Sequence, residues 1–188
     1  MARRRAGGPR NFTSYWKMEA ANVLFVPGLA LALGFPRSAL DAVAIGLAIA
    51  ACAGLLVIGA VFWRGVDRRL RFQDRVAASK ALRLADTAER PLLLVVGLAI
   101  AATVAALAVN GWTRAVIAAA VLTVLAVLEY INYYHRQLQH FDNVADLKRL
   151  FSGKGFKRSH MARELAAFRV GKSAARQASA KDDPFAPS

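Results

Sequence analysis

A cluster of polar and aromatic side chains, LEYINYYHRQLQH at residues 128–140, follows a long apolar stretch of the chain. On a helix, Glu129, Asn132 and Tyr133 share one face, because residues three and four apart are neighbours. An acidic side chain inside a membrane-length segment is a candidate functional group, since a charge at the centre of a bilayer costs about 3 kcal/mol or more. This face is therefore the first candidate site.

The depth of Glu129 decides between two roles. It stands 17 residues after Trp112, which is about 26 Å along a helix, whereas the hydrocarbon core of a bilayer is about 30 Å thick. Glu129 is thus placed near the edge of the core, and we expect an interfacial anchor rather than a proton or substrate site. An anchor would face headgroups or pair with one of the cations expected at that level, Lys17, Arg64 and Arg90.

Two other polar side chains, Glu19 and Asn22, occur near one end of an apolar segment. They would meet Glu129 if the first and fourth apolar segments are neighbours. His135 and His140 are five residues apart, about 140° around a helix, so both cannot bind one ion and no metal site is expected. The candidate polar cluster at the membrane interface comprises Glu129, Asn132, Tyr133, His135, Glu19 and Asn22.

No sequence motif specifies a reaction. The motifs GxGxxG, GxSxG and HExxH are absent. The sequence Gly171-Lys172-Ser173 ends like a P-loop, but Ala166 stands where the first glycine would be. The single cysteine, Cys52, excludes an internal disulfide. We therefore expect no catalytic residue and no cofactor, and we expect that the protein is not an enzyme.

Four apolar segments are long enough to place these side chains in a membrane, within an all-α domain of residues 15–134. Ser38 and Asp41 predict a helix start by a capping box, and Asn110-Gly111 predicts a short turn. The first segment also fits a signal peptide, because a basic stretch precedes it; we favour a retained helix, kinked at Pro27. The expected spans are residues 17–35, 39–63, 91–109 and 112–134.

Small residues recur every four positions on two of these segments. At that spacing they let another helix backbone approach closely. We expect both stripes to be helix-packing surfaces, within the bundle or between copies of the chain. The stripes are Ala42, Gly46, Ala50 and Gly54 on the second segment, and Gly97, Ala101 and Ala105 on the third.

Basic segments alternate with the apolar ones. The chain has 26 Lys and Arg against 12 Asp and Glu, a net charge of +14, and the alternation favours cytoplasmic loops over nucleic-acid binding. Because 24 of the 26 basic residues fall on one side, we expect an antiparallel four-helix bundle with both termini in the cytoplasm. Residues 64–90 predict an amphipathic helix on the inner leaflet or a solvated linker helix. Its lipid-facing cations are expected to be Arg64, Arg68, Arg69, Arg71 and Arg75.

The remaining segments lie around the spans. Residues 1–14 predict a disordered basic arm, and residues 171–188 a disordered tail. Residues 135–170 predict a helical cytoplasmic extension, amphipathic over its last part. Residues 86–89 resemble a capping signal for the third span, with Pro91 in its first turn.

These patterns predict a class of protein rather than an activity. We expect a multi-pass protein of the bacterial inner (plasma) membrane, acting as a non-enzymatic accessory subunit or scaffold. Its basic elements would contact anionic lipid headgroups, a partner membrane protein or a second copy of the chain. Two alternatives stay open: an oligomeric pore or small transporter with a polar site near Glu129, and a membrane enzyme that uses Glu129 and His135.

Overall fold

The computed structural model describes residues 12–136 and 158–181, with side chains from 15 to 136 and from 158 to 174. The expected basic arm up to residue 11, most of the extension after the fourth span, with His140, and the end of the tail lie outside the described residues. The described elements are helices, and four of them are long and apolar enough to cross a membrane, which confirms the expected all-α fold with four candidate spans. They are α1 (Phe12–Leu33), α2 (Ala39–Phe72), α3 (Arg75–Asn110), α4 (Arg114–Tyr134) and α6 (His160–Lys181).

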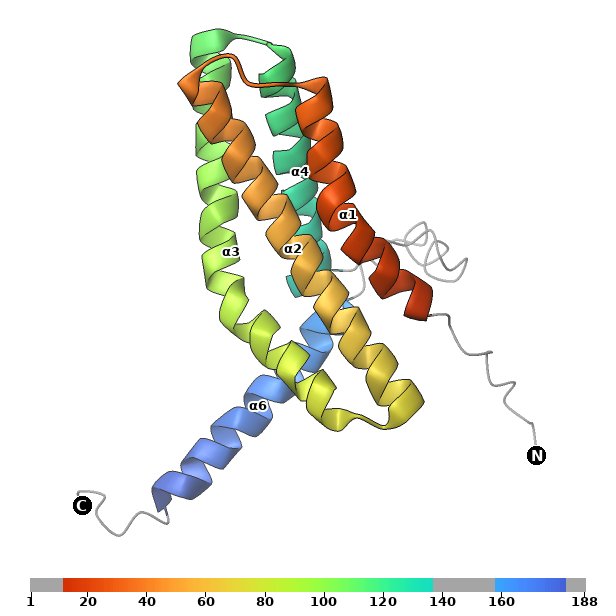
Figure 1. Cartoon of the computed structure of the whole chain (residues 1–188). Coiled ribbons are helices and arrows are strands. Elements are labelled where there is room, and N and C mark those ends of the chain that lie inside the picture. Colours follow the sequence, from red (N-terminus) through yellow and green to blue (C-terminus); the bar gives the residue numbers. More distant parts are fainter. Residues whose placement is uncertain (1–11, 137–157, 182–188) are drawn as a thin grey trace, which may run out of the picture.

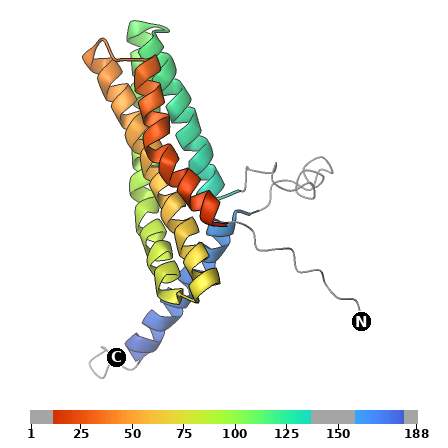
Figure 2. The ribbon, with the colours of Figure 1, turned by 45° about the vertical axis from the view of Figure 1, so that its right-hand side comes forward.

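The helices α1 to α4 lie side by side, and α2 packs against each of the other three (Figures 1 and 2). Alanines make much of the contact: Ala48 and Ala51 on α2, Ala99 on α3 and Ala119 on α4 are fully buried. Small side chains let the helices approach closely, so that van der Waals packing holds the bundle together. The largest fully buried side chains between them are Leu55, Leu122, Val116 and Cys52.

Large apolar side chains cover the outside of these helices. Leu24 on α1 is 80% exposed, Leu94 on α3 is 64% exposed and Val121 on α4 is 62% exposed. A continuous apolar surface is unfavourable in water and suits contact with lipid tails. The outer surface therefore agrees with the candidate spans.

Both small-residue stripes lie on this outer surface rather than between the helices. Ala42, Gly46 and Ala50 are exposed, and no described atom of another helix lies within 4 Å of a Cβ placed on Gly46. Only Gly54 meets a neighbouring helix, because its Cβ would lie 2.7 Å from Leu92 Cδ2 on α3. A contact of the stripes with a second copy stays a prediction. The third-segment residues are exposed in the same way: Gly97, Ala101 and Ala105.

Side-chain caps fix the turns at one end of the bundle. Ser38 Oγ accepts a hydrogen bond from the Asp41 N–H at 3.0 Å, which confirms the predicted helix start. Asn110 Nδ2 donates to Asp41 Oδ1 at 2.8 Å and to Ser38 Oγ at 2.9 Å. Gly111 follows α3 with a φ of 66°, and Thr113 caps α4. The two turns are thus tied to each other.

At the other end, α2 and α3 continue as a helical hairpin past the ends of α1 and α4 (Figure 1). Residues 64–90, the α2–α3 hairpin, are therefore not a separate surface helix. Gln73 ends α2 with a φ of 55°, and Asp74 caps α3. Pro91 lies inside α3 rather than in a first turn. The missing N–H leaves the carbonyl of Thr87 without its helical donor, and membrane helices tolerate such a break.

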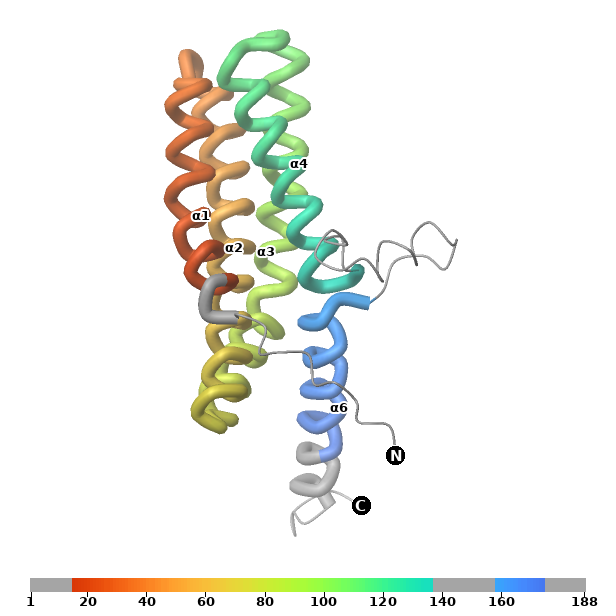
Figure 3. Tube along the Cα trace, turned by 90° about the vertical axis from the view of Figure 1, so that its right-hand side faces the viewer, coloured from red at the N-terminus to blue at the C-terminus, as the bar shows by residue number. Residues whose placement is uncertain are grey.

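The helix α6 lies at this second end, against α3 and α4 (Figure 3). Ser159 Oγ caps α6 and also donates a hydrogen bond to the Tyr133 carbonyl at 2.7 Å. Met161 and Leu165 are buried, as the amphipathic pattern predicts. The helix runs on to Lys181, so the first part of the tail expected to be disordered is helical. We call this second end of the bundle, which carries residues 64–90 and α6, the basic end of the molecule.

Candidate functional site

Glu19 and Glu129 lie side by side on two helices that touch, α1 and α4. Glu19 is 14 residues from Leu33 and Glu129 is 15 residues from Arg114; at 1.5 Å per residue both carboxyls are about 22 Å from the turns at the far end. Glu19 is only 5% exposed and Glu129 is half-buried. The two carboxyl groups are close enough to interact electrostatically.

The Tyr133 hydroxyl is directed at both carboxyl groups and interacts with each of them. Tyr133 is 4% exposed. Its Oη and the Oε2 atom of Glu129 are buried, and neither has a hydrogen bond of ordinary geometry to a described residue. The Asn132 side chain also interacts with Glu129. Buried polar atoms are normally paired, so two orphaned oxygens at one place single out the space between them.

A glycine on α2 forms the wall against Tyr133. A Cβ on Gly59 would overlap the Tyr133 hydroxyl, and the ring carbon Cζ would lie 2.6 Å away. Cys52, two turns earlier on α2, is fully buried and interacts with both carboxyl groups. The site is thus enclosed by α1, α2 and α4. The sequence did not point to Gly59 or Cys52, because it does not show which face of α2 meets α4.

The acidic pair has no basic partner in the part of the chain that the structure describes. The ion pairs found there do not include Glu19 or Glu129. The cations at this level point elsewhere: Arg64 lies over the Trp16 ring at 5.4 Å, and Lys17 lies 5.9 Å from the same ring. The expected anchoring ion pair of Glu129 is therefore not formed, since packing against α1 and α2 turns the carboxyl group inward.

The structure brings together four of the six predicted cluster residues. His135 is exposed, and its ring packs against Tyr130 with centroids 5.5 Å apart. Asn22 is half-buried on α1, one turn after Glu19. The cluster therefore reduces to Glu19, Glu129, Asn132 and Tyr133.

Ion pairs tie α6 to the α2–α3 hairpin. Arg69 donates two hydrogen bonds to Glu164, each at 3.0 Å, and its guanidinium holds the pKa of that carboxyl group below its usual range. Arg169 pairs with Asp86 at 2.6 Å and with Glu89. Asp86 and Glu89, which belong to the predicted capping signal at residues 86–89, therefore bind α6.

Aromatic rings link α6 to α2, and α2 to α1. The His160 ring is parallel to Trp63 within 9°, with centroids 5.9 Å apart. Phe62 packs edge-on against His160, and Tyr15 lies 5.6 Å from Trp63. No sequence signal pointed to this group, because its members are far apart in the chain.

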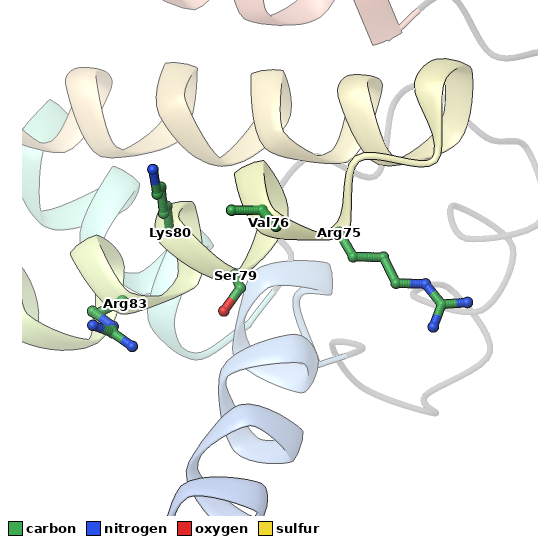
Figure 4. Close-up of a pocket in the computed structure, with 5 residues that line it drawn as sticks. All are labelled: Arg75, Val76, Ser79, Lys80 and Arg83. Carbon is green, nitrogen blue, oxygen red and sulfur yellow. The ribbon is translucent and has the colours of Figure 1, made fainter.

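Basic side chains cover the outside of the α2–α3 hairpin. Of the five cations expected to face lipid, Arg69 is half-buried against α6, while Arg68 and Arg71 are exposed but paired with Asp74 and Asp67. Arg64 and Arg75 are exposed as well. A surface hollow of about 330 Å³ on α3 is lined by Arg75, Val76, Ser79, Lys80 and Arg83, without an acidic side chain (Figure 4).

Comparisons of the chain with protein-family models, with curated proteins and with solved structures found no match. The fold defines a helical protein with four candidate membrane spans.

Proposed function

We propose that the chain is a multi-pass protein of the bacterial inner membrane, an antiparallel four-helix bundle with both termini in the cytoplasm. The basic end would face the cytoplasm, because 24 of the 26 Lys and Arg belong to segments on that side. The exposed apolar surface of α1, α3 and α4 supports contact with lipid tails.

The proposed role is that of a non-enzymatic accessory subunit or scaffold, which presents the α2–α3 hairpin to a cytoplasmic partner protein. One observation carries this role: apolar side chains are exposed where the hairpin projects farthest. Phe72 is 73% exposed and Val76 is 64% exposed. Phe72 stands nine residues beyond Trp63, about 13 Å along the helix, whereas a headgroup layer is only about 5–8 Å thick. The tip therefore reaches beyond lipid.

The charges around this tip suit an acidic partner. Arg75, Lys80 and Arg83 form no ion pair with the described residues. Exposed apolar groups with a basic rim are the pattern of a protein-binding surface. Closer to the membrane, Arg64 and Arg90 would meet anionic headgroups at about 1 kcal/mol each.

Photo-crosslinking in living cells tests this role. A photo-reactive amino acid in place of Phe72 should give a discrete protein adduct, and the double change Arg75→Glu with Lys80→Glu should lower its yield several-fold. The same probe at Leu94, which faces lipid, is the control and should give no protein adduct. Adducts with lipid alone at Phe72 would contradict the partner-protein role.

A second candidate, a small transporter or oligomeric pore, is favoured by the buried pair of Glu19 and Glu129. A pore additionally needs several chains around an axis, for which the exposed stripe at Gly97 offers a close contact. Mass measurement in detergent separates the two: a pore gives a defined oligomer, whereas a scaffold gives a monomer or a complex with another protein.

A further inference from the structure

We propose that Glu19 and Glu129 form an intramembrane binding site in which a small alkali cation, of which Na⁺ is the example, competes with a proton. The site lies where α1, α2 and α4 meet. The proposal goes beyond the scaffold role and does not depend on it, since it concerns only the bundle.

The charge of the pair requires a positive partner. Two carboxyl groups that lie close together and are largely shielded from water cannot readily both stay ionised without compensation. Sharing one proton leaves a single negative charge, which either a second proton or one monovalent cation neutralises. Binding one Na⁺ would thus release one proton, and the net charge of the site stays the same.

Tyr133 is the independent observation that points to a ligand. Its side chain is 4% exposed, and the hydroxyl is directed at both acids without a hydrogen bond of ordinary geometry to a described residue. Gly59 makes room for this hydroxyl between α2 and α4, because a Cβ there would overlap it. A hydroxyl oxygen and the free Oε2 of Glu129 are ligands that a cation would satisfy.

The donor set suits a hard, singly charged ion. Carboxylate and hydroxyl oxygens favour hard cations over zinc or copper, and the described residues contain no group of three His, Cys, Asp or Glu that could hold a metal ion. Calcium takes about six to eight oxygen ligands, more than Glu19, Glu129 and Tyr133 offer. A small monovalent cation needs less charge and fewer ligands.

The other titratable and charged groups on the packed helices leave the pair uncompensated. Cys52 on α2 and Tyr133 on α4 interact with it and are neutral when protonated. Of the other charged groups near this level, Arg90 on α3 is exposed, and six further groups contact other partners. Lys17 and Arg64 lie over Trp16, Asp86 and Glu89 pair with Arg169, His135 packs on Tyr130, and His160 packs on Trp63.

The test uses the full chain in lipid nanodiscs, with NaCl compared with N-methylglucamine chloride at equal ionic strength. At alkaline pH, Na⁺ should raise the thermal unfolding midpoint, because it binds the folded state only. The shift should shrink as the pH falls and protons occupy the site. Adding NaCl in weak buffer should also release protons, detected with an indicator dye.

The changes Glu129→Gln and Glu19→Gln should each abolish both the Na⁺ shift and the proton release. Tyr133→Phe keeps the carboxyl groups, so it should move the Na⁺ response to higher concentration and supplies a variant if a glutamine variant does not fold. Glu164→Gln, outside the bundle, should leave both responses intact. The proposal would be overturned if Na⁺ did not change the thermal unfolding midpoint of the unaltered chain. It would also be overturned if the Na⁺ shift were still present in both glutamine variants.

Discussion

At the scale of single residues, glycines with the same local setting in a helix have different structural roles. Gly46 and Gly97 have open space where a Cβ would go, whereas Gly59 has the Tyr133 hydroxyl there. Inserting atoms into a packed contact costs about 1–3 kcal/mol, while alanine in an open helical position gains about 1 kcal/mol over glycine.

Gly59→Ala should therefore lower the thermal unfolding midpoint in detergent, because the Tyr133 phenol has to move. Gly46→Ala and Gly97→Ala are the matched controls and should leave the midpoint unchanged or raise it. An unaltered midpoint for Gly59→Ala would show that the phenol moves aside without cost. A loss of stability for Gly46→Ala would instead point to a contact between copies of the chain.

The sequence predicted part of the candidate site and missed the rest for a physical reason. Helical spacing placed Glu129, Asn132 and Tyr133 on one face, because that depends only on their separation along one helix. Whether Glu19 faces these three residues depends on which helices are neighbours, and the spacing along one helix does not show that. The same limit left open whether the stripe around Gly46 packs within the bundle or between copies of the chain, and in the structure the buried face of α2 is adjacent to it.

At the scale of elements, α6 is attached to the rest of the molecule by polar contacts at several points. Its capping residue Ser159 donates a hydrogen bond to the Tyr133 carbonyl. Glu164 forms an ion pair with Arg69, and Arg169 forms one with Asp86. A bidentate pair of Arg and carboxylate that is partly shielded contributes about 1 kcal/mol. No single contact therefore fixes α6, and its docking should respond to changes of charge.

Arg69→Glu should release α6, because it places two acidic groups against each other at Glu164. The double change Arg69→Glu with Glu164→Arg should restore docking. Chymotrypsin cleavage after the half-buried Phe168 measures the released fraction. Lys172→Ala removes only an exposed contact at 3.4 Å and serves as the control. Equal cleavage of the single and double variants would contradict a role for this ion pair.

Docking of α6 should also weaken in acid. The pKa of Glu164 is lowered in the folded chain by Arg69, so its contribution to docking is fully present above the pKa of the undocked carboxyl, near 4.3. It is lost as the pH falls through the lower folded value, because the docked carboxylate must then be protonated. Glu164→Gln should reduce this acid-induced release, and the part that remains should come from Asp86, whose pKa is also lowered by its α6 partner Arg169.

The sequence predicted a helix boundary correctly where a side chain caps the helix. It did not do so where the prediction rested on a proline. Ser38 marked the start of α2 correctly, because its hydroxyl binds the helix's own backbone. Pro91 suggested a helix start, yet α3 passes through it. Packing against α2 along the whole hairpin holds the two halves of α3 in one helix, and that packing is a tertiary effect.

At the scale of the whole molecule, charge and apolar surface are separated along the axis of the bundle. The far end carries Arg37 and Arg114, and the other Lys and Arg of the described residues lie toward the basic end. Positively charged loops stay in the cytoplasm during insertion. The excess is large enough that moving one or two charges should not invert the protein.

Reporter fusions measure this orientation directly. Fusions after Arg10, at Ser79 and after Gly171 should all report the cytoplasm, and a fusion after Asn110 should report the external side, because an even number of spans separates the first three sites. Arg37→Ala and Arg114→Ala are controls that should only strengthen the pattern. An external signal at Ser79 would place the α2–α3 hairpin outside the cell, and it would remove the basis for a cytoplasmic partner at Phe72 while leaving the cation site at Glu19 and Glu129 in the membrane.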